Sequence, residues 1–254
     1  MIFDSHAHYD DKAFDDDRDS ILTHLFNNNI SGIINVGCDL KTSKTSVELS
    51  NKYSHIWAAV GIHPQDASNV TSSYLKILRD YLSLEKTVAI GEIGLDYHYD
   101  FSPRDVQKKI FEEQLKLAKE LDIPVIIHDR EAHADTLELL KIYQPRGVVH
   151  CFSASLEMAN EIIKLGMYIG LGGSVTFKNA KNPILVAKNV PIDKILLETD
   201  CPYMTPVPFR GTRCDSSMIK YTAEKIASER NIDVNALIST AKENTLRLFN
   251  KIKL

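Results

Sequence analysis

Short apolar segments recur along the whole chain and alternate with longer amphipathic ones. Each short segment is mostly apolar and is bounded by polar residues or glycine. Near-continuous apolar runs of this kind are typical of parallel strands that are buried on both faces. The pattern predicts eight strands, over residues 1–3, 32–37, 56–61, 87–92, 124–128, 147–151, 167–170 and 194–199.

The segments between these strands carry apolar residues at helical spacing. In residues 105–121, Val106, Ile110 and Leu117 belong to such a pattern, and Pro103 near its start is a favourable entry signal. Ser155 and Asp233 are suitable N-caps for two later helices. The predicted helices span residues 105–121, 134–143, 155–165, 216–228 and 234–249.

The alternation of strands and helices predicts an α/β fold. Repeated strand–helix–strand units imply right-handed crossovers and a parallel sheet. Eight such units in 254 residues predict a TIM-like (β/α)8 barrel that takes up residues 1–254 as a single domain. The alternative is an open doubly wound sheet, which would normally use about five or six strands.

Histidines and carboxylates stand where the predicted strands end. Barrel active sites form at the C-terminal ends of the strands, so these residues are expected to meet. Side chains two residues apart on a strand share a face, so His6 and His8 can converge on one point. The seventh strand ends in glycines, which leave room. The residues at the other strand ends are His6, His8, His63, Glu92, His128, His150 and Asp200.

These residue types predict a metal centre at the C-terminal ends of the strands. Imidazole and carboxylate ligands without thiolate suit zinc, manganese, iron, magnesium or nickel. Glu92 has two oxygens and can bridge two divalent ions, with Asp200 accepting the proton of the attacking water. The expected ligands of one ion are His6, His8, Glu92 and Asp200, and those of the other are Glu92, His128 and His150.

Six stretches together resemble the TatD family of metal-dependent deoxyribonucleases, within the amidohydrolase-like barrel superfamily. They lie at residues 4–8 (DSHAH), 61–64 (GIHP), 89–97 (AIGEIGLDY), 127–130 (IHDR), 150–153 (HCFS) and 198–203 (ETDCPY). The resemblance implies a barrel with a divalent-metal centre that hydrolyses phosphodiester bonds of DNA, from a strand end. Its metal positions correspond to His6, His8, Glu92, His128, His150 and Asp200.

The resemblance also implies which residues contact the substrate. Arg210 and His63 are expected to face substrate phosphate, and Asp96 is expected to contact substrate or to hold its loop. In the family, the segment after the arginine resembles Gly-Lys-Arg-Asn-x-Pro, whereas residues 211–216 here read GTRCDS. Arg213 is kept, and we expect it to hold phosphate together with Arg210. The missing asparagine and proline leave the identity of the substrate open.

Composition limits the class of protein. The formal charge of −4, from 34 acidic and 30 basic residues, argues against a protein that coats nucleic acid by bulk electrostatics. It leaves room for an enzyme that grips one or two phosphates. Four scattered cysteines without a C-x-x-C pair indicate a reduced, cytoplasmic protein. No apolar run approaches the roughly 18 residues of a membrane span, so no membrane partner is expected.

These observations leave three functions. The first is a deoxyribonuclease that cleaves DNA single strands or strand ends, with no obligate protein partner. The second is a metal-dependent hydrolase of a small-molecule amide, lactone or phosphoester, or of an ester carried on RNA. Related barrels of the second kind often bridge their metals with a carboxylated lysine, whereas the fourth strand here ends in Glu92. The third, a metal-stabilised scaffold, is disfavoured because every ligand position is filled.

Overall fold

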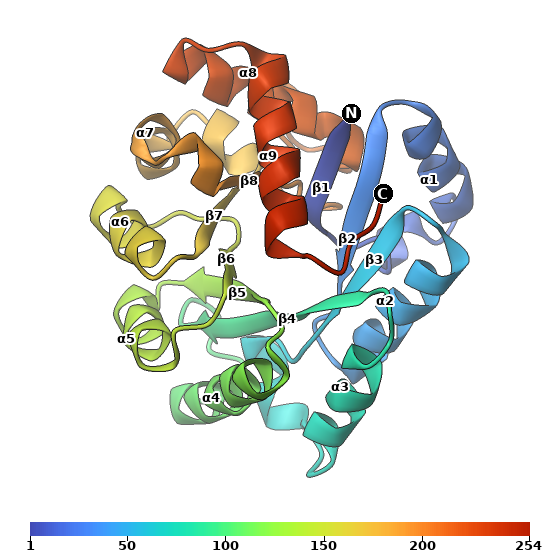
Figure 1. The fold of residues 1–254 in the computed structure, drawn as a ribbon, viewed down its shortest axis with the longest axis vertical. Helices are drawn as coiled ribbons and strands as arrows, with labels where there is room; N and C mark the ends of the chain where they lie inside the picture. Colours follow the sequence, from blue (N-terminus) through green and yellow to red (C-terminus); the bar gives the residue numbers. More distant parts are fainter.

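The computed structural model describes residues 1–254 and contains one sheet of eight parallel strands. Neighbouring strands follow one another in chain order, and the sheet curves into a barrel (Figure 1). This arrangement confirms the predicted barrel and excludes the doubly wound alternative. The strands are β1 (Ile2–Ala7), β2 (Ile30–Val36), β3 (Ile56–Val60), β4 (Thr87–Asp96), β5 (Val125–Arg130), β6 (Gly147–Val149), β7 (Tyr168–Leu171) and β8 (Ile195–Leu197).

Helices surround the barrel (Figure 1). Each strand leads toward the next helix through a connection at the C-terminal end of the sheet. The five predicted helices are present within a few residues of their predicted bounds. Ser155 and Asp233 cap two of them with side-chain hydrogen bonds, as predicted. The helices are α1 (Arg18–Asn27), α2 (Leu40–Lys52), α3 (Tyr74–Leu82), α4 (Arg104–Leu121), α5 (His133–Tyr143), α6 (Leu156–Lys164), α7 (Lys181–Asn189), α8 (Ile219–Arg230) and α9 (Val234–Leu248).

Hydrogen bonds between the first and last strands close the barrel. The Ser5 hydroxyl donates to the carbonyl of Leu197 over 3.0 Å. Beyond β8, the amide of Asp200 donates to the carbonyl of His6, and the amide of His8 donates to the carbonyl of Cys201, over 3.0 and 2.8 Å. These bonds place the end of β1 directly beside the residues that follow β8.

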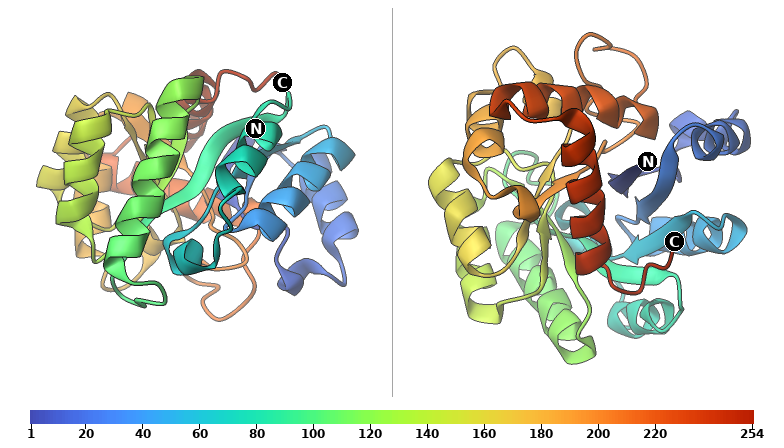
Figure 2. Two further views of the ribbon diagram at one scale, coloured as in Figure 1. Left: turned by 90° about the horizontal axis from the view of Figure 1, so that it is seen from below. Right: turned by 45° about the horizontal axis from the view of Figure 1, so that its top comes forward.

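The end of α9 and the tail after it fill the N-terminal end of the barrel. Leu248, Phe249 and Ile252 pack in one buried cluster with apolar side chains from all eight strands, including Trp57 and Tyr168. Figure 2 shows both termini at one end of the molecule and the long connection after β8, in orange, at the other. The C-terminal ends of the strands are therefore the end at which a site can open.

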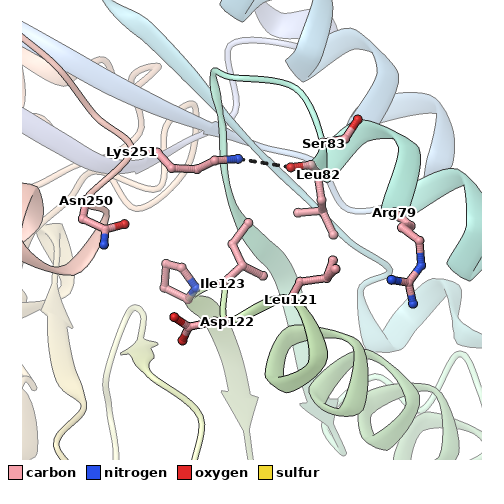
Figure 3. A pocket seen from close by; sticks show the side chains of 9 residues that line it. Arg79, Leu82, Ser83, Leu121, Asp122, Ile123, Asn250 and Lys251 are labelled. Atoms are coloured by element: carbon pink, nitrogen blue, oxygen red, sulfur yellow. Dashed lines mark hydrogen bonds between the residues drawn. The ribbon is translucent and has the colours of Figure 1, made fainter.

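A cavity of about 390 Å³ lies near the closed end, between α3, the start of β5 and the C-terminal tail (Figure 3). Its cations are already used by the fold. The ammonium of Lys251 donates to the carbonyls of Leu82, Leu84 and Thr87 over 2.8–3.2 Å. Arg79 pairs with Glu120 at 2.6 Å. The lining therefore supports the fold and offers no unpaired cation to a ligand.

No helix of the structure combines the length and the apolar composition needed to cross a bilayer.

We predict that Phe249→Ala destabilises the protein strongly. Phe249 is fully buried in the barrel interior, and truncation of such a side chain costs about 3–5 kcal/mol. Chemical denaturation measures this loss as a lower free energy of unfolding. The matched control is Ile142→Ala on the outer surface of α5, where the side chain is 60% exposed and little change is expected. Equal stabilities for both variants would contradict this account of barrel closure.

Candidate metal centre

His6 of β1 and His8, directly after this strand, point to one place. Their Nε2 atoms lie 3.1 Å apart, and both side chains are buried. Nδ1 of His8 is 2.8 Å from the carbonyl of Val36, which can only accept, so this nitrogen carries the proton. In the neutral imidazole, the lone pair of His8 Nε2 therefore faces His6. Burial lowers the pKa of His6 to about 4, so this ring is neutral at physiological pH. Burial acts in the same direction on His8, but Cys38 and the carboxylate of Asp200 outweigh it, and the pKa of His8 lies well above its ordinary value.

Glu92, near the middle of β4, lies between two groups of histidines. Its Oε2 atom is 3.5 Å from Nε2 of His6 and 3.7 Å from Nε2 of His8. Its Oε1 atom is 2.8 Å from Nδ1 of His128 and 2.8 Å from Nε2 of His150. One carboxylate oxygen thus faces each group, which is the arrangement that a bridging ligand requires.

Asp200 adjoins His6 and His8 on the other side. Its Oδ1 atom is 3.3 Å from Nε2 of His8 and 3.7 Å from Nε2 of His6. The residue has a left-handed backbone, with φ of 61°, a conformation that aspartate adopts more readily than most residues. Since its amide is bonded to the carbonyl of His6, the seam of the barrel also fixes this carboxylate beside β1.

His63 lies beside the second group of histidines. Its Nε2 atom is 3.6 Å from Oε1 of Glu92, and its ring contacts His128 edge to face with the centroids 4.4 Å apart. Nδ1 of His63 accepts a bond from the amide of Gln65, so Nε2 carries the proton of the neutral ring. Burial lowers the pKa of His63 to about 3. The residue therefore offers an N–H donor to the centre.

The donor set fits divalent ions. His6, His8 and Glu92 offer ligand atoms close enough together for one ion. On the other side, Nδ1 of His128 and Nε2 of His150 lie 3.5 Å apart, and each is 2.8 Å from Oε1 of Glu92. Lone pairs that converge in a buried space are unfavourable unless a cation lies between them. Imidazole nitrogens with carboxylate oxygens are the ligands that zinc and similar ions take in proteins. The residues present can thus hold metal on both sides of Glu92.

Asp4 supports the centre from behind. It is fully buried and accepts hydrogen bonds from the hydroxyls of Thr199 and Ser216, over 2.6 and 2.7 Å, and from the amide of Thr199. It bonds no imidazole side chain. Asp4 instead ties β1 to the segment that carries Asp200, so it positions the carboxylate rather than a ligand ring.

Glu198 lies behind His150, where a glycine makes room for it. Its carboxylate accepts from the amide of Cys151 and lies 3.7 Å from Nδ1 of His150. Burial raises the pKa of Glu198 to about 8. A Cβ atom at Gly170 would lie only 2.5 Å from Oε2 of Glu198. Gly170 of β7 therefore leaves space, as the sequence indicated, and Glu198 fills it.

Cys38 is a neighbour of the centre that the sequence analysis missed. Its sulfur is 3.7 Å from Oε2 of Glu92 and 4.0 Å from Nδ1 of His8. The available signal was its position, because it follows Gly37 at the end of the second strand. Its residue type gave no signal, because the ligands expected at the strand ends were imidazoles and carboxylates.

Asp96 and Arg213 are both engaged by the chain itself. Asp96 is fully buried, with Oδ2 at 3.3 Å from Nε2 of His128. Its other oxygen accepts from the amides of His98 and Tyr99, which agrees with the expected alternative that it holds its loop. Arg213 donates to both carboxylate oxygens of Asp17 and to the carbonyl of Ala13. Its guanidinium is therefore engaged by the chain's own N-terminal loop, which corrects its expected role in holding phosphate.

Arg210 remains available. One of its nitrogens donates to the carbonyl of Thr205 over 2.9 Å, and its guanidinium lies 4.0 Å from the ring centroid of Phe177. It is exposed on the connection after β8 and forms no ion pair. The loop that departs from the family's pattern therefore presents one free cation.

Comparisons with known proteins agree with this geometry. The profile of the TatD-related DNase family matches residues 3–250. An uncharacterized metal-dependent hydrolase of Bacillus subtilis, YabD, is 43% identical over 98% of this chain and 99% of its own length. The 3'-5' ssDNA/RNA exonuclease TatD of Escherichia fergusonii is 31% identical, with 98% of both chains covered. The crystal structure of the TatD homologue YjjV from Escherichia coli superposes with a TM-score of 0.93, at 32% identity and 98% coverage of both chains.

Proposed function

The chain belongs to the TatD-related DNase family of metal-dependent hydrolases, and from this premise we propose that it is a nuclease that removes nucleotides from single-stranded DNA. The observation that carries the proposal is the carboxylate of Glu92, which turns one oxygen to each of two histidine groups. Hydrolysis at phosphorus needs charge neutralisation on two sides, and a bridged pair of ions provides it. The name of the Escherichia fergusonii relative supports a single-stranded substrate and attack from the 3' end.

We assign two divalent ions to the centre. His6, His8, Glu92 and Asp200 would hold one, and Glu92, His128 and His150 would hold the other. When bound, such ions neutralise phosphate charge and lower the pKa of water. Cys38 lies next to the first group, so a soft ion such as zinc is compatible with the surroundings.

The chain's own residues would carry the proton and hold the phosphate. Asp200, at the edge of the first group, would take the proton from the attacking water with the carboxylate oxygen that does not hold the ion. His63 would donate its Nε2 hydrogen to a phosphate oxygen, which suits a neutral imidazole. Arg210 would bind a second phosphate on the open face with its remaining nitrogens. Asp96 would hold His128 in position and would not contact substrate.

The depth of the centre favours ends of single strands. His6, His8 and Glu92 are buried, so the reacting phosphate must enter the barrel mouth. A single strand would bring its terminal phosphate to this depth more readily than a duplex, because its end is not paired. We also propose a cytoplasmic location, which the four scattered cysteines favour.

We predict that His128→Ala and Asp200→Asn each lose at least ~100-fold in kcat on a labelled single-stranded oligonucleotide. His128→Ala removes the contact to Oε1 of Glu92, and Asp200→Asn removes the proton acceptor. Asparagine also tolerates a left-handed backbone, so folding should be retained, and circular dichroism checks this. His24→Ala on the exposed side of α1 is the matched control. Parental activity in both variants, under conditions in which the parent cuts, would refute the proposed mechanism.

We predict that reversing the charge of Arg210 weakens substrate binding. Arg210→Glu should raise KM for the oligonucleotide about ten-fold and reduce the salt slope of log(kcat/KM) by about 0.7, the value for one contact to a single strand. Arg213→Glu breaks the pair with Asp17, so its main effect should be a lower Tm. An unchanged KM and salt slope in Arg210→Glu would remove this residue from the substrate site.

A further inference from the structure

Two aromatic side chains project from the connection between β4 and α4. Tyr99 is 46% exposed and Phe101 is 68% exposed, although most large apolar side chains of this protein are buried. Their rings are stacked, with centroids 5.4 Å apart and an interplanar angle of 23°. We call this pair the aromatic shelf. The Tyr99 ring also has the Arg130 guanidinium and the His98 ring as neighbours, each 4.7 Å from its centroid, so Phe101 is the more open of the two rings.

The shelf is attached rigidly to the metal centre. One carboxylate oxygen of Asp96 accepts from the amides of His98 and Tyr99, over 3.0 and 3.1 Å. The other oxygen lies 3.3 Å from Nε2 of His128. A single buried carboxylate thus joins the shelf to a histidine that contacts Glu92.

Gln107 of α4 fastens both ends of the same connection. Its side chain accepts from the amide of Asp96 over 2.9 Å and donates to the carbonyls of Asp96 and Ser102 over 3.0 and 2.8 Å. Gln107 is itself buried. The aromatic rings are therefore exposed but held in place, so a partner that stacks on them need not order a loose loop.

One unpaired cation accompanies the shelf. The guanidinium of Arg130, at the end of β5, lies 4.7 Å from the ring centroid of Tyr99 and forms no ion pair. Close by, Arg104 pairs with Asp100 at 2.9 Å, and Nδ1 of His98 lies 2.8 Å from the carboxylate of Glu131. Flat apolar rings next to one free cation suit a ligand with flat aromatic groups and negative charges.

We propose that the aromatic shelf stacks one or two bases of the nucleic-acid strand whose phosphate reacts at the metal centre. Arg130 binds a phosphate between those bases and the reacting one. Single-stranded nucleic acid has both chemical features, since every base offers a π-face and every linkage a charge. The proposal rests on the proposed nuclease function and adds to it the surface that holds the strand. Stacking of this kind is tolerant of sequence, so little base preference is expected.

The test compares a single-stranded oligonucleotide with versions that carry an abasic residue at one of the three terminal positions of the attacked end. The parent should cleave the intact strand with a kcat/KM about ten-fold higher than that for at least one abasic version. In Phe101→Ala this ratio should fall to near one, because the stacking partner is gone. Phe101→Trp should restore it, since a larger ring stacks as well. Ile142→Ala, another exposed apolar position, should keep the parental ratio.

The outcomes separate this proposal from the function on which it rests. If the parent cleaves no oligonucleotide at all, the nuclease function fails and the shelf proposal falls with it. If the parent cleaves all substrates equally, or if Phe101→Ala keeps the parental ratio, the shelf alone is refuted. A dimer of the parent that Phe101→Ala dissociates in sedimentation would assign the rings to a second copy of the chain and would also refute the proposal.

Discussion

The buried carboxylate of Glu92 is the constraint on which the site depends. A carboxylate removed from water is costly unless charges or donors compensate it. Burial alone raises the pKa of Glu92, but electrostatic interactions with His150 and His63 and the bond with His128 outweigh it, and the pKa lies well below its usual value. The group is therefore an anion among imidazoles that come from four strand ends. The barrel is the fold that can bring so many strand ends to one carboxylate.

The seam of the barrel extends this constraint to Asp200. Strands β1 and β8 are far apart in sequence, and the bonds of Ser5 and Asp4 to the segment 197–199 hold them together. Asp4 thus contributes to chemistry without touching a ligand ring. On the opposite side, Asp96 performs a similar task for His128 and also fixes the aromatic shelf. Two buried aspartates, one on each side of Glu92, thus fix the segment that carries Asp200, the His128 ring and the aromatic shelf.

Much of the fold and of the site could be predicted from the sequence. The spacing of apolar residues indicates the strands and helices, and the position of a polar residue at a strand end indicates which residues it will meet. Eight apolar runs indicated the barrel, and reading the residue at each strand end located the histidines and carboxylates that the structure brings together. Helices α1, α2, α3 and α7 were not specified. In α2, buried Ser43 and Ser46 occupy positions where a hydrophobic pattern would show apolar residues. Parallel strands β2 and β3 need a crossover connection between them, and this requirement outweighs the weak helical pattern of the segment.

The errors concerned side-chain partners that lie far away in sequence. No residue near Arg213 in the sequence indicates that it will pair with Asp17, because the two are brought together only when the barrel closes. Buried Asp96 likewise has its hydrogen-bond partners in other elements: its amide donates to Gln107, and its carboxylate accepts from Gln65. The residue type of Cys38 gave no signal, because the expected ligands were imidazoles and carboxylates. Position at a strand end is therefore a stronger guide than residue type, whereas exposure and pairing need the folded chain.

The most direct test of the central claim is a crystal structure grown with Mn²⁺ and measured for anomalous scattering. The account predicts two anomalous peaks about 3.5–4 Å apart, one on each side of Glu92 and each within bonding distance of one of its carboxylate oxygens. The first peak should also contact His6 and His8, and the second His128 and His150. Peaks that contact no oxygen of Glu92, or a fully loaded site with one ion on one side only, would contradict it.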